Sequence, residues 1–270
     1  MQRAVVVLLS DFGLRDGYAG VLRGVMLGMA PELTVVDLSH EVQPYAVLSA
    51  AYLLHAAWDY FPEGSVFCAV VDPGVGSARL ACLAQCQGRV LIGPDNGLMS
   101  LLAHRRAGLQ AYALEPTAPP RRASGAAAGP AALSATFHGR DLFAPAAALA
   151  ASFGPQRVRG PRIEPVLLSE VKPERRGALW SARVLHIDRF GNCITSLHAD
   201  DLRGLNPNRL EVRLRGARVR GLKRTYSEAP RGALLALLGS CGFLELALRE
   251  ASAAGRYGVR IGDPVFVTQH

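Results

Sequence analysis

Apolar runs and amphipathic stretches alternate through about the first 115 residues, and this alternation limits the fold more than any other feature. Residues 5–9 form an unbroken run of branched aliphatic side chains, as expected of a strand that is buried on both faces. Further strands are predicted at 33–38, 65–71, 80–86 and 90–92, and helices at 18–29, 47–61 and 97–107. Strands that alternate with helices predict an α/β domain whose central sheet is mostly parallel and flanked by helices.

The pattern changes after Gly177. Leu210, Val212 and Leu214 alternate with charged residues, which is typical of a strand with one buried face. Other short strands are predicted at 182–187, 194–197, 233–238, 243–248 and 265–268. Turn residues separate these segments, so the second part is predicted to be a smaller all-β, barrel-like domain.

Two irregular stretches divide the chain. Residues 116–135 are rich in Pro, Ala, Gly and Ser and are predicted to be a surface loop, followed by a helix at 142–152. The stretch 154–177 is rich in Pro, Gly and Arg and marks the expected domain boundary. We therefore divide the chain into domains at 1–165 and 176–270.

Composition excludes several classes of protein. The chain is 50% hydrophobic and 19% charged, the opposite balance to that of a disordered chain. Its longest apolar run, around 144–151, is much shorter than the ~20 residues of a membrane span. The apolar stretch at the N-terminus has no cleavage pattern of a signal peptide. We expect a cytoplasmic protein with no membrane partner.

Charge and cysteine content argue against nucleic-acid and metal binding. The net charge is +8, but nearly all the basic residues are Arg, spread along the chain and not clustered with stacking aromatic residues. The five Cys include no second pair at the spacing of a zinc site. We predict neither a nucleic-acid partner nor a metal site.

Three strands of the first domain end in polar turns that contain glycine. These turns are Ser-Asp-Phe-Gly at 10–13, Asp-Pro-Gly-Val-Gly at 72–76 and Gly-Pro-Asp-Asn-Gly at 93–97. Ligands of open α/β sheets bind beyond the carboxyl ends of the strands, so Asp11, Asp16 and Asp72 are expected near one crevice, with Asp95 as a further candidate. One such turn alone would be read as a helix cap, whereas three together favour a site. Neither a Gly-x-Gly-x-x-Gly sequence nor a phosphate-binding Gly-Lys-Ser/Thr is present.

Two other segments carry candidate functional side chains. Residues 136–141 read Thr-Phe-His-Gly-Arg-Asp and open a predicted helix. Residues 187–192 read Ile-Asp-Arg-Phe-Gly-Asn between two predicted strands. A hairpin turn would explain the second segment equally well, but Phe190 could stack on a base and Asn192 could hydrogen-bond to its edge.

Together these segments resemble the S-adenosylmethionine hydroxide adenosyltransferase family, the hydrolytic relatives of fluorinases and chlorinases. The resemblance extends from Leu9 to about Val267. It implies an N-terminal α/β domain that carries catalysis, a C-terminal β-barrel that contributes the adenine site, and a homotrimer. Each active site would lie between the first domain of one subunit and the second domain of the next.

The resemblance implies hydrolysis of S-adenosylmethionine to adenosine and L-methionine, with water attacking the ribose C5′ in line. The catalytic set would be Asp72, Arg79 and His138. In the halogenating relatives an aromatic residue replaces this Asp and a Ser follows this His, so Asp72 and Gly139 favour water over halide. Either Asp72 or His138 would accept the proton. The substrate would be the small-molecule partner, with no cofactor.

Substrate-binding roles carry over in the same way. Asp11 would hold the two ribose hydroxyls, Asp16 would face the methionine ammonium, and Tyr45 would lie against the sugar. Thr136 and Phe137 would line the pocket around the reacting carbon.

The second domain would hold the rest of the substrate. Phe190 would stack on adenine, Asn192 would bind its edge, and Ser240 would hold the methionine moiety. Two positions depart from the family pattern. Cys241 stands where the halogenases have Arg, and Arg249-Glu250 replaces an Asn-Gly pair, which leaves the adenine contacts there open.

Four other functions stay open at this point. The chain could be a halogenase on the same scaffold, a non-catalytic binder of S-adenosylmethionine or adenosine, or a basic nucleic-acid-binding protein. A metal-dependent hydrolase would need neutral His ligands near the Asp cluster, and His40 and His138 are the candidates.

Overall fold

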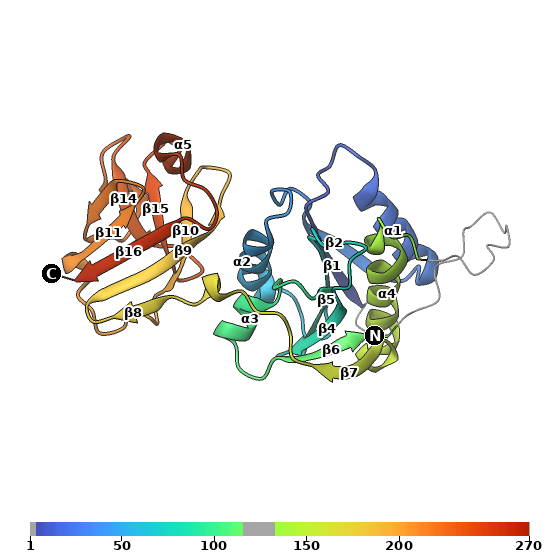
Figure 1. Cartoon of the computed structure of the whole chain (residues 1–270). Helices are drawn as coiled ribbons and strands as arrows, with labels where there is room; N and C mark the ends of the chain where they lie inside the picture. Colours follow the sequence, from blue (N-terminus) through green and yellow to red (C-terminus); the bar gives the residue numbers. More distant parts are fainter. Residues whose placement is uncertain (1–3, 116–132, 270) are drawn as a thin grey trace. The chain divides into compact units, whose positions relative to one another are not determined.

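The computed structural model describes residues 4–115 and 133–269. The chain forms two compact units, Met1–Leu167 and Leu168–His270 (Figure 1). Most of the predicted loop at 116–135 lies outside the described residues.

The first unit is built on a seven-stranded mixed sheet in the order β2-β1-β3-β5-β4-β6-β7. The strands are β1 (Val5–Ser10), β2 (Thr34–Ser39), β3 (Val66–Val70), β4 (Ala81–Cys86), β5 (Arg89–Pro94), β6 (Gln110–Leu114) and β7 (Arg159–Ile163). The four strands β2, β1, β3 and β5 run parallel, whereas β4, β6 and β7 join by antiparallel pairing.

The prediction of a mostly parallel sheet is therefore not confirmed, because the sheet is mixed, and the cause is a short turn. Cys86 of β4 pairs with Arg89 of β5, so only Gln87 and Gly88 connect the two strands. Both have positive φ, +49° and +73°, as a tight two-residue hairpin requires. Such a hairpin can join only antiparallel strands. The sequence analysis also missed β6 and β7, and β7 lies in the stretch that it assigned to the domain boundary.

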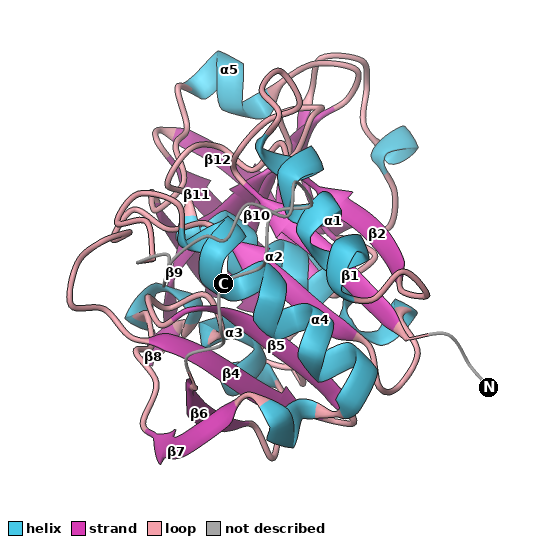
Figure 2. Cartoon of the chain, turned by 90° about the vertical axis from the view of Figure 1, so that its right-hand side faces the viewer, coloured by secondary structure: helices cyan, strands magenta, loops and turns pink. Residues whose placement is uncertain are grey.

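Helices cover both faces of this sheet, as expected. Side chains along β1 alternate: Val6 and Leu8 pack into one core, and Val7 and Leu9 into the other. Helices α1 (Tyr18–Met29) and α4 (Ala144–Phe153) lie side by side over the first core (Figure 2). Helices α2 (Val47–Ala57) and α3 (Ser100–Arg105) contribute to the second. The result is a three-layer unit whose strand ends carry the candidate site.

The second unit is an almost closed β-sheet, in agreement with the predicted barrel-like domain. Its strand order is β12-β11-β16-β9-β10-β15-β14-β13, with β8 paired to β9. The strands are β8 (Glu174–Arg176), β9 (Leu179–Ile187), β10 (Cys193–His198), β11 (Leu210–Leu214), β12 (Ala217–Arg220), β13 (Leu222–Lys223), β14 (Leu234–Leu238), β15 (Phe243–Leu248) and β16 (Pro264–Gln269). A short helix, α5 (Ala253–Tyr257), follows β15. Strands β12 and β14 approach each other near the two ends of this order, which encloses one aliphatic core.

One glycine of the first unit allows two loops to meet. Gly76, in the turn after β3, has φ +78°. A Cβ atom there would lie 2.5 Å from the carbonyl oxygen of Ala135. Any other residue would therefore push apart the turn after β3 and the segment that leads to His138.

Gly76→Ala is expected to lower the free energy of unfolding by about 2–4 kcal/mol, because backbone strain and overpacking add. Gly64→Ala is the matched control, since Gly64 has φ +83° but open space around its Cβ position. Chemical denaturation of both variants would measure the difference. Equal losses in the two variants would show that the contact at Ala135 costs nothing.

Candidate active site

The turns after β1 and β3 leave the same edge of the first sheet. These strands are parallel neighbours, with Ser10 opposite Val70. Asp11 directly follows β1 and Asp72 follows β3 after one residue, on chains that are about 4.8 Å apart within a sheet. The prediction that both carboxylates lie at one sheet edge is therefore confirmed.

Arg79 links Asp72 to His138. Its Nε donates to Asp72 Oδ1 at 2.9 Å and to Oδ2 at 3.1 Å, and its Nη2 also donates to Oδ2. The same Nη2 lies 2.7 Å from His138 Nδ1. The side chains of Asp72 and Arg79 are only 6% and 10% exposed. The three residues predicted to be catalytic thus form one connected, largely buried cluster.

The hydrogen bonds of this cluster determine the tautomer of His138. An Arg guanidinium can only donate, so His138 Nδ1 must accept and the ring proton must be on Nε2. Burial, helped by the Arg79 charge, lowers the pKa of His138 below its ordinary value, against the opposing effect of Asp72 and Asp141. At neutral pH the ring is therefore uncharged and presents an N–H at Nε2.

Local structure holds each member of the cluster in place. Ser77 Oγ donates to the carbonyl of Gly74 at 2.7 Å and accepts from the Arg79 N–H at 3.3 Å, which fixes the turn. Asn96 donates to the carbonyl of Val71, the residue before Asp72, at 2.9 Å. His138 stands at the start of a π-helical turn, Gly139–Phe143, that runs into α4, and such turns are frequent at functional sites.

Aromatic side chains connect the turn after β1 to the segment of His138. The rings of Phe12, Tyr18 and Phe137 contact one another, with centroids 5.2–6.0 Å apart. Phe12 follows Asp11, and Phe137 precedes His138. Thr136 is exposed, and its hydroxyl lies 3.3 Å from that of Ser134.

Asp11 and Tyr45 are in direct contact. The backbone N–H of Tyr45 donates to Asp11 Oδ2 at 2.8 Å, and Tyr45 has the left-handed φ of +68°. The Tyr45 side chain is 71% exposed. Asp16 is exposed in the loop before α1. The fixed direction of the Asp11 carboxylate is compatible with the predicted role toward ribose.

Asp95 does not belong to this cluster. Its Oδ1 accepts a hydrogen bond from the backbone N–H of Val166 at 2.9 Å, and the residue is 7% exposed. Burial raises the pKa of its carboxyl. Asp95 thus follows β5 at the same sheet edge, where its carboxylate anchors the segment at the end of the first unit.

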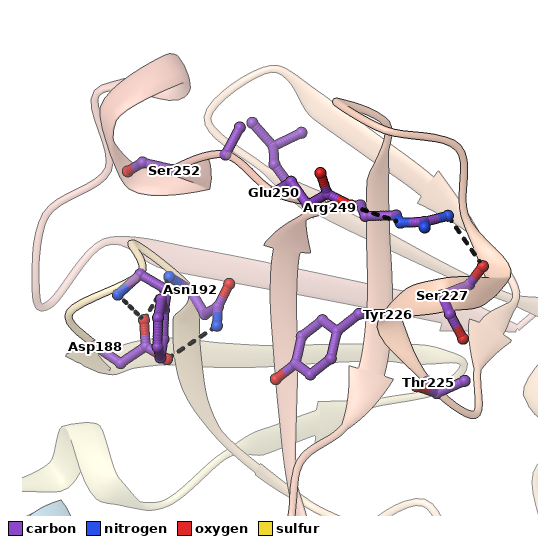
Figure 3. Close-up of a pocket in the computed structure, with 11 residues that line it drawn as sticks. Asp188, Asn192, Thr225, Tyr226, Ser227, Arg249, Glu250 and Ser252 are labelled. Carbon is purple, nitrogen blue, oxygen red and sulfur yellow. Dashed lines mark hydrogen bonds and ion pairs between the residues drawn. The ribbon is translucent and has the colours of Figure 1, made fainter.

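The second unit contains a pocket of 820 Å³ that both predicted adenine-binding residues line (Figure 3). Phe190 is 76% exposed, so a large apolar face is available for stacking. Asn192 is 7% exposed, and its Nδ2 donates to Asp188 Oδ2 at 2.9 Å. This bond directs the amide nitrogen to Asp188, which leaves Asn192 Oδ1 as the acceptor that the amide offers to a ligand.

Several residues of this pocket were missed by the sequence analysis. The Tyr226 hydroxyl donates to Glu245 Oε1 at 2.6 Å, and burial raises the pKa of both groups. Arg249 donates to the carbonyl of Ala229 at 2.8 Å and so holds the segment of Tyr226. No local pattern marks Tyr226, because the pocket combines segments that are far apart in the sequence. Asp188 lies inside a segment that was noted, but no role was given to it.

Ser240 lies apart from these residues. It is exposed in the turn between β14 and β15, next to the half-buried Cys241. It is not among the described residues that line the pocket. Its role toward methionine stays a prediction.

Neither a metal centre nor a membrane span is found in the described part of the chain. No three His, Cys, Asp or Glu side chains within 4–115 and 133–269 gather as metal ligands would. No helix in the same ranges is long and apolar enough to span a membrane.

Comparison with solved structures supports the fold. A crystal structure titled as an uncharacterized conserved protein from Thermotoga maritima matches with a TM-score of 0.84 and 28% identity, over 98% of this chain and all of that one. A conserved hypothetical protein from Thermus thermophilus matches with a TM-score of 0.76 and 39% identity, over 99% of this chain and 100% of that one.

Comparison with curated proteins and family models gives the family. A Thermus thermophilus protein named (R)-S-adenosyl-L-methionine hydrolase is 43% identical over 96% of this chain and 98% of its own length. A Salinispora arenicola protein of the same name is 39% identical over 96% and 95%, and a fluorinase of Nocardia brasiliensis is 29% identical over 98% and 97%. The models of the SAM hydroxide adenosyltransferase N-terminal and C-terminal domains match residues 6–158 and 182–266. The chain therefore belongs to the S-adenosylmethionine hydroxide adenosyltransferase family.

Proposed function

We propose that this protein hydrolyses S-adenosylmethionine to adenosine and L-methionine. The observation that carries the proposal is the connected cluster of Asp72, Arg79 and His138 in a chain that is 30–43% identical to curated S-adenosylmethionine hydrolases. A non-catalytic binder would have no need of this buried cluster beside the proposed ribose site.

The reaction needs a positioned nucleophile more than an acid. A water oxygen forms a bond to the ribose C5′ while the C5′–sulfur bond breaks. The electron pair stays on sulfur, so methionine leaves as a neutral thioether and needs no proton. One proton must leave the attacking water. Orientation of that water in line with the breaking bond is the main contribution that the protein can make.

The tautomer of His138 supports a division of labour. Its Nε2–H can donate to the water oxygen and orient it, while its Nδ1 lone pair is taken by Arg79. His138 is therefore not the base, and the Asp72 carboxylate accepts the proton. Arg79, which can only donate, holds Asp72 and His138 in the required directions.

The substrate carries a sulfonium and an ammonium, and acidic side chains suit it. Asp11 binds the two ribose hydroxyls, Asp16 faces the ammonium, and Tyr45 lies against the sugar. The exposed ring of Tyr45 and the fixed Asp11 carboxylate support these roles. Thr136 and Phe137 line the pocket near the reacting carbon.

Adenine binds in the pocket of the second unit. Phe190 stacks on the base, and Asn192 Oδ1 accepts a hydrogen bond from its amino group. Tyr226 forms a further wall of the same pocket. Ser240 contacts the methionine moiety.

Water is favoured over halide as the nucleophile. Gly139 is buried, and a Cβ atom there would lie 3.3 Å from Phe137 Cε2 and 3.4 Å from Phe12 Cζ. A Ser at this position, as in the halogenating relatives, would require both rings to shift. Those relatives have an aromatic residue at the position of Asp72, and this difference also favours water as the nucleophile.

The names of the relatives also suggest a stereochemical preference. The label (R) in (R)-S-adenosyl-L-methionine refers to sulfur, because L already defines the amino-acid carbon. Inversion at sulfur exchanges the positions of the methyl group and the methionine chain. We propose that this chain shares the preference for the R epimer.

Purified protein incubated with each separated epimer in halide-free buffer should release adenosine and methionine in equal amounts. The R epimer should react about tenfold faster or more, the range that a methyl-sized difference gives in a shaped pocket. Liquid chromatography measures both products. Product formation only after chloride or fluoride is added would identify a halogenase, and binding without products would identify a binder.

His138 variants test the assigned tautomer. His138→Asn keeps an acceptor near Arg79 but loses the Nε2–H, and His138→Ala loses both. Each should lower turnover by about 10²–10⁴-fold if the Nε2–H orients the water. The pKa of His138 is lowered, so the ring should stay neutral when the pH falls past about 6.5, the ordinary pKa of histidine. Wild-type activity should therefore persist at this pH and be lost only at lower pH. Turnover of His138→Asn equal to that of the wild type would refute the role of Nε2.

We also propose that the protein works as a homotrimer in which the first unit of one subunit and the second unit of another share each active site. Each unit carries half of the required groups, and Tyr45 and Phe190 expose large aromatic surfaces on their respective units. The cytoplasmic location and the absence of nucleic-acid, membrane and cofactor partners stay predictions.

Mixing two impaired variants, assayed at a substrate concentration too low for Phe190→Ala to bind well, tests the shared site. Asp72→Ala damages the first unit, and Phe190→Ala weakens substrate binding in the second by about 1–3 kcal/mol of lost stacking. Co-refolded or co-expressed mixtures should regain activity, because some sites combine an intact first unit with an intact second unit. Light scattering should give the mass of three chains. No recovery of activity in a mixed oligomer would place the whole site in one chain.

A further inference from the structure

A second buried polar array lies next to the site, and the proposed reaction does not use it. His40 Nδ1 lies 2.7 Å from Ser10 Oγ, and His40 Nε2 lies 3.1 Å from Asp37 Oδ1. Ser10 is 1% exposed and His40 is 2% exposed. Burying two polar side chains costs free energy unless their hydrogen bonds are made. The presence of this array therefore indicates that it has a function in the protein.

The hydrogen bonds of Arg23 and His40 both end on the Asp37 carboxylate. Arg23 donates to both oxygens of Asp37, so this carboxylate acts as an acceptor. His40 therefore donates from Nε2 to Asp37, and its Nδ1 is paired with the Ser10 hydroxyl. The Ser10 oxygen in turn accepts from the backbone N–H of Phe12 at 3.3 Å.

The array has the residue types of a hydrolytic Ser-His-Asp triad but not its geometry. In such a triad Nε2 of His faces the Ser, and Nδ1 faces the Asp. Here the two nitrogens are exchanged, and Ser10 is too deeply buried to meet a substrate. The array therefore acts on its surroundings and not on a reacting group.

Its surroundings are the turn that carries Asp11. Ser10 and Phe12 flank Asp11 and are joined through the Ser10 hydroxyl. The carbonyl of His40 accepts from the Gly13 N–H at 2.7 Å. His40 thus holds the turn on both sides of Asp11, once through its ring and once through its backbone.

We propose that His40 is a positioning residue for ribose recognition, acting through Ser10 and the turn of Asp11. Two hydroxyls are bound together only if both carboxylate oxygens lie in the plane of the diol. The backbone of a short turn sets that plane, and the His40 ring prevents the turn from rotating. This inference rests on the proposed function in that it takes Asp11 as the ribose ligand.

A pair of variants separates the two ends of the His40 ring. In His40→Asn the amide oxygen takes the place of Nδ1, so it keeps the bond to Ser10 and loses the one to Asp37. In His40→Gln the amide takes the place of Nε2, so it keeps Asp37 and loses Ser10. Ser10→Ala removes the hydroxyl itself and tests the same link if His40→Gln does not fold.

The readout is the preference for a ribose diol over a deoxyribose. Isothermal titration calorimetry of the full-length protein with adenosine and with 2′-deoxyadenosine measures it without turnover. Wild type should prefer adenosine by about tenfold or more, as expected for a hydrogen bond to a charged group. His40→Gln and Ser10→Ala should lose most of this preference, and His40→Asn should keep it. Ser152→Ala, at a buried hydroxyl without a partner in the described chain, is the matched control.

Three results would overturn the inference. Wild type could bind both nucleosides equally, the preference could survive in both His40→Gln and Ser10→Ala, or both ligands could weaken by the same factor. The last result would mean that the array serves stability alone. Failure of the proposed function is distinguished by the parallel assay: wild type that binds adenosine with the expected preference but releases no products refutes hydrolysis and leaves the role of His40 intact.

Discussion

The first unit depends on a single guanidinium that serves two partners. Arg79 donates to both oxygens of Asp72 and to Nδ1 of His138, so it fixes the ionised carboxylate and the ring tautomer together. This arrangement requires that the turn after β3 and the start of the π-helical turn be very close, which Gly76 permits. The ion-paired cluster of Asp72, Arg79 and His138 thus depends on three features: the strand order of the sheet, Gly76, and the position at which the π-helical turn begins.

The two units present different chemical groups, because their architectures differ. The ends of parallel strands bring charged turns to one edge, which suits a cationic, hydroxyl-rich part of a substrate. The β-rich unit offers a pocket with an exposed aromatic ring and an oriented amide, which suits a flat base. Neither unit alone has both sets of groups.

Much of the site was predictable because strand ends are visible in a sequence. Asp11 and Asp72 follow from apolar runs that stop at polar turns, whereas the role of His138 follows from the family resemblance. The antiparallel half of the sheet was not predicted, since a two-residue turn at Gln87 and Gly88 reverses the chain with little signal. Asp95 follows a strand end as Asp11 does, but its carboxylate accepts a hydrogen bond from the backbone N–H of Val166. No local sequence pattern predicts this contact. Tyr226 depends on contacts between distant segments and is invisible to local reasoning.

Two histidines of the first unit are held in fixed orientations by partners of fixed polarity. His138 accepts at Nδ1 from an arginine that can only donate, and His40 donates at Nε2 to a carboxylate that can only accept. His138 cannot take up a proton at Nδ1 without breaking its hydrogen bond to Arg79. Such rings serve orientation better than proton transfer. This matches a reaction whose sulfonium needs no proton to leave as a neutral thioether, because the remaining barrier is the alignment of water, ribose and sulfur, and rigid hydrogen bonds lower that part of the barrier.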